Sequence, residues 1–113
     1  MIDGYSFGRI VIAGITYRSD LKIVTGKVVP DWWRNAGHAV GKDDVGDILA
    51  AAPQYFVIGQ GNPGLMTVTA DFAAELARLG IELIEEPTAQ AITTFNRLYE
   101  AGKNVAAGFH LTC

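Results

Sequence analysis

The pattern of apolar residues divides the chain into two parts. Residues 5–30 hold short runs of β-branched and aromatic residues separated by glycines, as is typical of strands joined by tight turns. This part predicts a β-meander that ends at Pro30, because proline stops regular strand pairing. Residues 31–42, with two tryptophans and two glycines, predict an irregular connection.

From Asp43 onward, helical and strand-like spacing alternate. Apolar residues spaced three and four apart predict three helices, between Asp43 or Asp44 and Pro53, between Thr69 and Gly80, and between Pro87 and Gly102. In the second helix, Phe72, Leu76 and Leu79 are expected to face inward.

The uninterrupted apolar run at 55–58 predicts a strand buried on both faces, and two further strands are predicted at 81–84 and 105–111. They lie before, between and after the last two helices. Alternation of strand and helix implies right-handed parallel crossovers. The order predicts a single α/β domain over residues 1–113, in three layers with a mixed central sheet, in which an N-terminal β-meander precedes a βαβαβ unit.

Length and composition agree with this fold class. A chain of 113 residues suffices for one hydrophobic core, and no apolar run approaches the roughly 20 residues of a membrane span. No basic or apolar leader is visible at the start, and the single cysteine, Cys113, cannot form an internal disulfide. We therefore expect a cytoplasmic protein without a membrane span.

The net charge of −3 is unevenly distributed. Up to Lys42 there are six basic and three acidic residues, and after it three basic and nine acidic residues. Such polarity can orient a protein partner or steer an anion, although solvated surface charge is the simpler interpretation. The acidic balance counts against binding to nucleic acid.

The predicted parallel strands also indicate where a ligand site would lie. Ligands of open parallel sheets bind beyond the carboxyl ends of the strands, which here are Gly59–Gly64, Glu85–Thr88 and His110–Cys113. Gly59, Gly61 and Gly64 match the spacing of a dinucleotide-binding loop. However, Pro63 and further residues separate them from the next helix, which favours a tight loop, with an anion or small polar ligand as the alternative.

The remaining chemistry-bearing residues do not form a complete catalytic set. His110 is either a general base or a hydrogen-bonded structural residue, and the terminal Cys113 lacks an activating partner. His38 and His110 have no third ligand at metal-binding spacing, so we expect no metal. Asp43, Asp44 and Asp47 are explained as helix-start residues.

Trp32 and Trp33 are expected to point to opposite sides of an extended segment, so one of them is a candidate exposed anchor for a partner. Arg9, Asp20 and Arg34 are candidates for a polar cluster, together with Ser6 and Tyr17.

Several short motifs occur in an order that resembles a known family. They are Tyr5-Ser6-Phe7-Gly8-Arg9-Ile10, Tyr17-x-x-Asp20, Trp33-Arg34-x-x-Gly37-His38, Ile58-Gly59-x-Gly61, Thr88-x-x-Ala91 to Asn96, and His110-Leu111-Thr112-Cys113. The chain resembles the Mth-type domain family, which includes an adipogenesis-associated protein and a mitochondrial complex I assembly factor. The resemblance implies a three-layer α/β fold and no established reaction, and its assembly-factor branch implies a role in binding protein partners.

The resemblance and the sheet-edge argument together define two sets of candidate residues. The candidate pocket consists of Gly59, Gly61, Thr88, Asn96 and His110, of which Asn96 comes from the resemblance alone. The candidate polar or docking surface consists of Arg9, Asp20, Trp32, Trp33, Arg34 and His38.

Two functions follow from these sets. The first is a non-enzymatic, assembly-factor-like module that binds a protein partner and needs no cofactor, with self-association left open. The alternative is a binder of small molecules or anions, or an enzyme, with its site at Gly59–Gly64, Thr88 and His110.

Overall fold

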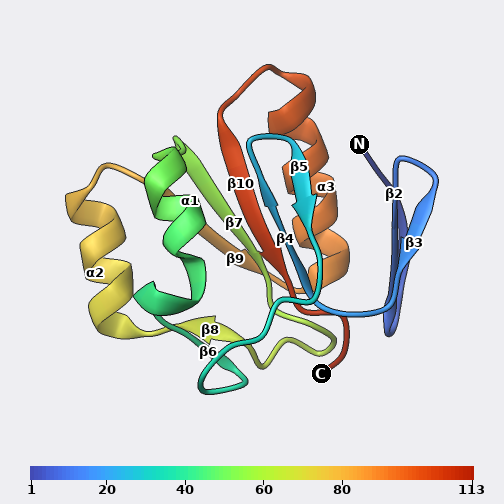
Figure 1. Ribbon diagram of the computed structural model, residues 1–113, viewed down its shortest axis with the longest axis horizontal. Coiled ribbons are helices and arrows are strands. Elements are labelled where there is room, and N and C mark those ends of the chain that lie inside the picture. Colours follow the sequence, from blue (N-terminus) through green and yellow to red (C-terminus); the bar gives the residue numbers. More distant parts are fainter.

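A five-stranded mixed sheet forms the middle layer of the computed structural model, which describes residues 1–113 (Figure 1). In spatial order its strands are β5 (Lys27–Val29), β4 (Leu21–Val24), β10 (Val105–Phe109), β7 (Tyr55–Gly59) and β9 (Glu82–Glu86). The last three run parallel, and β4 pairs antiparallel with both β10 and β5. The predicted α/β class, with a parallel half contributed by the C-terminal part of the chain, is confirmed.

The predicted meander is divided between two sheets. Strands β1 (Ile2–Ser6), β2 (Arg9–Ile12) and β3 (Ile15–Tyr17) form a separate antiparallel sheet beside the third helix, whereas β4 and β5 extend the central sheet (Figure 1). Two further strands of two residues each, β6 (Ala39–Val40) and β8 (Thr67–Val68), pair in parallel. They are too short to leave a recognisable pattern in the sequence.

The helices lie on both faces of the sheet. A 3₁₀ turn, η1 (Lys42–Val45), leads into α1 (Gly46–Ala51), and α1 and α2 (Ala70–Arg78) cover one face. The longest helix, α3 (Thr88–Glu100), covers the other face (Figure 1). None of these helices combines the length and apolar character needed to cross a bilayer.

One residue of α2's expected inner face is placed differently. Phe72 and Leu76 are buried as predicted, but Leu79 is 51% exposed, which corrects the expectation. The helix ends at Arg78 and Leu79 is its C-cap, so only the first two of the three predicted positions lie within the helix.

The central sheet separates two hydrophobic cores. Along β7, Val57 packs toward α3 and the N-terminal sheet, while Phe56 and Ile58 pack toward α1 and α2. Side chains alternate between the faces of a strand, so a strand covered on both faces must be apolar at every position. This explains the uninterrupted apolar runs of β7 and β10.

The two edges of the central sheet are protected. At one edge, β9 carries the exposed residues Glu82 and Glu85. At the other, β5 has only three residues, begins at the exposed Lys27 and is followed by Pro30. Charged side chains, proline and short length are the usual means by which edge strands avoid pairing with another chain.

The close approach of Trp32 to β10 yields a stability prediction. A Cβ atom added at Gly108 would lie 2.6 Å from the Trp32 ring, whereas one at Gly4 would meet no atom within 4 Å. We expect Gly108→Ala to lower the free energy of unfolding by about 1–3 kcal/mol through overpacking. Urea unfolding with Gly4→Ala as the matched control tests this, and equal effects of the two substitutions would contradict it.

Candidate functional site

The carboxyl ends of the three parallel strands meet at one end of the sheet, where the C-terminus also lies (Figure 1). The His110 N–H donates to the Gly59 carbonyl at 2.9 Å, and the Asn62 N–H donates to the Thr112 carbonyl at 2.8 Å. The Gln60 N–H donates to the Glu86 carbonyl at 2.8 Å. The segments that sequence analysis assigned to one edge therefore contact one another.

Most of the space between these segments is filled. Thr88 is fully buried, and its hydroxyl donates to the His110 carbonyl at 2.6 Å and accepts from the Gly61 N–H at 2.8 Å. Gly61 has φ of +95°, and a Cβ atom there would lie 2.2 Å from the Thr112 carbonyl oxygen. A Cβ atom at Gly59 would lie 2.6 Å from the Phe109 ring. These glycines allow the close approach of backbone to the last residues of the chain.

Asn96 does not join the other candidate pocket residues. It lies on α3, where its side-chain amide donates to the Ile2 carbonyl at 2.8 Å and its side-chain carbonyl accepts from the Ile2 N–H at 2.9 Å. This pair of bonds attaches the first strand to the helix, so its placement with the sheet-edge group is corrected. Gly59, Gly61, Thr88 and His110 do lie together.

Asp20, in the turn before β4, connects the polar residues of this end. One oxygen, Oδ2, lies 2.7 Å from Arg34 Nη2 and 2.7 Å from His110 Nδ1. The other, Oδ1, accepts from the Leu111 N–H at 2.9 Å. Sequence analysis singled out all three side chains but placed Asp20 and Arg34 apart from His110, because nothing in a linear sequence links residues 90 positions apart.

The Asp20 carboxyl is held in its charged form. Burial raises its pKa, but the hydrogen bonds from His110, the Leu111 N–H and Arg34 outweigh burial and hold the pKa below its ordinary value. A charged carboxylate requires the proton on His110 Nδ1, so in the neutral ring Nε2 carries the lone pair. Burial, followed by the Asp20 charge, raises the pKa of Tyr5, whose hydroxyl donates to the Leu111 carbonyl at 2.9 Å.

Two nitrogens of this group have no protein partner. They are Arg34 Nη1 and His110 Nε2, both inaccessible to solvent on side chains that are only 7% and 9% exposed. The His38 ring lies edge-on to the His110 ring, with the centroids 5.3 Å apart. Buried donors and acceptors are normally paired, so these two nitrogens are exceptions within the group.

Arg34 also packs on Trp32, the first of the two adjacent tryptophans. Its guanidinium lies over the Trp32 ring, 4.6 Å from the centroid, and its Nε donates to the Gly37 carbonyl. The Trp32 indole N–H donates to the Asp44 carbonyl at 2.9 Å, and its backbone N–H donates to the Asp20 carbonyl at 2.8 Å. Trp32 is therefore buried and anchored.

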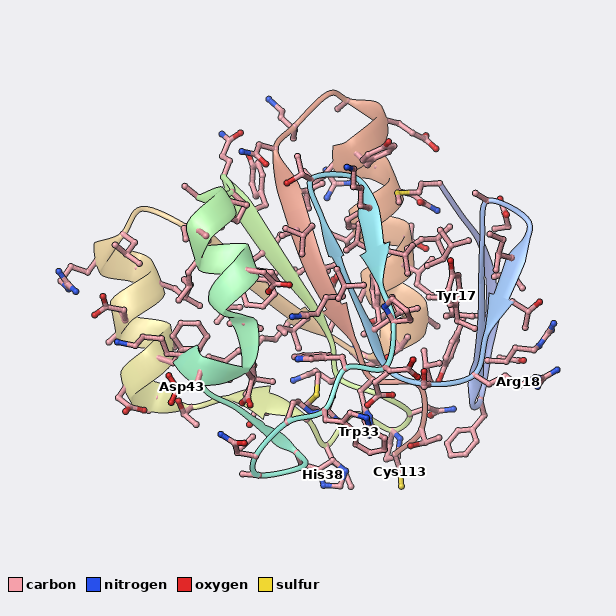
Figure 2. All side chains as sticks on the ribbon, viewed as in Figure 1. Tyr17, Arg18, Trp33, His38, Asp43 and Cys113 are labelled. Carbon is pink, nitrogen blue, oxygen red and sulfur yellow. The ribbon has the colours of Figure 1, made fainter.

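The neighbouring Trp33 points the other way. It is 85% exposed, as expected for one of two adjacent residues in an extended segment. Figure 2 shows it at the same end of the molecule as His38 and Cys113. Its indole ring is thus presented to solvent from a segment whose two flanking side chains, Trp32 and Arg34, are held in place.

Arg9 lies outside the Asp20 group. It is exposed, and its Nε donates to the Ser6 hydroxyl at 3.3 Å within the β1–β2 turn. The expected polar cluster is therefore corrected: Asp20 and Arg34 form it with His110, without Arg9. Among the acidic residues near η1, Asp44 accepts from the Gly41 and Asn35 N–H groups, and Asp47 pairs with Lys22 at 2.8 Å.

The fold and this arrangement of segments define a class of small α/β domains that is also found in solved structures. The protein MT938 is 26% identical to this chain, and the two superpose with a TM-score of 0.80. The match covers 100% of this chain and 98% of MT938. A conserved hypothetical protein from Pyrococcus horikoshii OT3 is 21% identical, with 100% and 99% coverage and a TM-score of 0.88. A Bordetella pertussis protein described as an Mth938-like domain is 14% identical, with 98% and 85% coverage and a TM-score of 0.76.

The sequence match identifies the family. Residues 2–110 match the family described as "Protein of unknown function (DUF498/DUF598)". The chain belongs to this family of Mth938-like domains, which confirms the resemblance to Mth-type domains.

The Asp20 group predicts a pH-dependent contribution to stability. We expect Asp20→Asn to lower the free energy of unfolding at neutral pH by about 2 kcal/mol, because Arg34 would lose its buried counterion. The folded-state pKa of Asp20 is lowered, so its contribution is complete above the unfolded-state pKa of about 4 and is lost as the pH falls further. Urea unfolding from neutral pH down to about pH 2.5 measures this.

Glu75→Gln is the matched control, since its ion pair with the 70% exposed Arg78 is at the surface and should contribute little to the free energy of unfolding. If the difference between wild type and Asp20→Asn stays constant from neutral to acidic pH, the assignment of a charged Asp20 is wrong.

Proposed function

We propose that this protein is a non-enzymatic protein-binding module that docks its partner at the end of the sheet bearing Trp33. The observation that carries the proposal is the 85% exposure of Trp33 on a segment that is otherwise fixed. Burial of a tryptophan ring from water is among the largest contributions that one side chain makes to an interface.

The fixed backbone around Trp33 favours binding. Trp32 and Arg34 are both held by hydrogen bonds, so docking at Trp33 requires little ordering of the chain. Preorganisation of this kind lowers the entropic cost of association. An exposed aromatic residue on a mobile loop would lack this advantage.

A second exposed aromatic residue belongs to the same end of the molecule. Phe7, in the β1–β2 turn, is 59% exposed, and the following Gly8 N–H donates to the Leu111 carbonyl at 2.8 Å. Leu111 in turn donates to Asp20, which holds Arg34 beside Trp33. The assembly-factor branch suggested by the family resemblance agrees with a docking function.

Replacing Trp33 tests this proposal. We expect Trp33→Ala to reduce the amount of captured partner by about tenfold or more in a quantitative pull-down from cell lysate, because an interface anchor is removed. Its free energy of unfolding should change by less than about 0.5 kcal/mol, since the ring packs against little of the fold. Leu79→Ala, an exposed apolar residue at the C-cap of α2, is the matched control.

Equal capture of every protein by wild type, Trp33→Ala and Leu79→Ala would contradict the proposal. If a second copy of this chain is the partner, sedimentation should show a dimer that Trp33→Ala dissociates.

A second candidate function is binding of a small anion or polar molecule next to His110. The unpaired Arg34 Nη1 and His110 Nε2 favour it, as both lie on side chains more than nine-tenths buried. Inorganic phosphate can donate its P–OH proton to His110 Nε2 and accept from Arg34 Nη1, so we expect it to raise the Tm of the wild type and not of His110→Ala, with sodium chloride at equal ionic strength as the control. An equal shift in both proteins would exclude this site.

A further inference from the structure

A continuous surface groove begins beside Trp33. One hollow of about 350 Å³ is lined by Trp33, Pro30 and Asp31, and a larger one of about 550 Å³ extends to Asp71 and Glu75 on α2. Both hollows are lined by Asn35, Asp43 and Asp44, so they adjoin each other. Figure 2 shows Asp43 beside α1, on the side of the molecule toward α2.

The groove is strongly acidic. Its lining carboxylates are Asp31, Asp43, Asp44, Asp71 and Glu75, and its lining cations are Lys22 and Lys42. Lys22 pairs with Asp47 outside the groove, and Glu75 pairs with Arg78. With these two partners included there are six carboxylates and three cations, an excess of three that equals the net charge of −3 of the whole chain.

Two carboxylates of the groove, Asp43 and Asp71, stand in the first turns of η1 and α2, where a negative charge is favourable, but they have no side-chain partner. Asp44 accepts backbone hydrogen bonds at the start of η1, which explains its presence. Asp43 and Asp71 are exposed, and neither side chain makes a hydrogen bond or an ion pair with its neighbours. Carboxylates that outnumber the cations along a groove are complementary to a basic partner.

Trp33 adds the apolar part of this recognition. Its ring lines the end of the groove and is almost fully exposed. A tryptophan face binds the guanidinium of arginine or the ammonium of lysine through cation–π attraction, and it also packs on their aliphatic stems. The same side chain can therefore contact an anchor residue of a basic segment whose other cations meet Asp43 and Asp71.

We propose that the partner presents an extended peptide segment with several arginine or lysine side chains, which lies along this groove from Trp33 to the start of α2. The inference rests on the docking function proposed above and specifies the chemistry of the partner. The acidic groove of this domain attracts a basic segment to one side of Trp33. It disfavours acidic segments through like-charge repulsion.

A short fluorescein-labelled peptide of alternating arginine and leucine is a suitable probe, compared with the same peptide carrying glutamine or glutamate in place of arginine. Fluorescence polarisation should give the lowest Kd for the arginine peptide. Raising the salt concentration from about 0.05 M to about 0.3 M should increase this Kd severalfold. Asp43→Asn with Asp71→Asn should weaken binding by about fivefold or more, and Trp33→Ala should do the same.

Glu82→Gln with Glu100→Gln is the matched control, because it removes the same charge from exposed residues of β9 and α3 outside the groove. The inference is overturned if the glutamine peptide binds as tightly as the arginine peptide, or if the control pair weakens binding as much as the groove pair.

The two proposals fail in different ways. If capture of the cellular partner depends on Trp33 but not on Asp43 and Asp71, the basic segment is wrong and the docking function stands. If neither peptide binding nor capture depends on Trp33, both are wrong.

Discussion

One carboxylate holds together the segments at the carboxyl ends of the parallel strands. Asp20 joins the turn before β4, the loop that carries the tryptophans, and the residues that follow β10. Without it, Arg34 would be a buried cation with no counterion, a situation that proteins avoid because desolvation of an unpaired charge is so unfavourable. Arg34 in turn covers Trp32, and the position of Trp32 determines that Trp33 points into solvent.

The carboxyl ends of the parallel strands are packed against the residues that follow β10. The glycines that would approach a ligand in a nucleotide-binding fold instead approach the chain's own last residues, as Gly61 does with Thr112. The two surface hollows lie away from these strand ends, between the loop that carries the tryptophans and α2. This end, filled inside, with an exposed tryptophan and bordered by an acidic groove, is the surface at which we propose that the partner docks.

Sequence reasoning succeeded where local pattern and burial agree and was incomplete where contacts are distant. The runs of β7 and β10 identified both central strands because burial on two faces demands apolar residues throughout. Thr88 was correctly placed at the strand ends, since helix and strand order determine that position. Asn96 was misplaced because its role is to bind Ile2, a contact that no spacing reveals. The ordered motifs held Asp20, Arg34 and His110, but only three-dimensional structure shows that they meet.

The protected edges of the central sheet have a consequence for the docking function proposed above. The glutamates along β9, and the short β5 followed by Pro30, disfavour pairing of a foreign strand with either edge. Contact must then be made by side chains at the end of the sheet. The proposed interface then depends on side chains and not on strand pairing, so proteins of unrelated fold could share it if each exposes a similar extended basic segment.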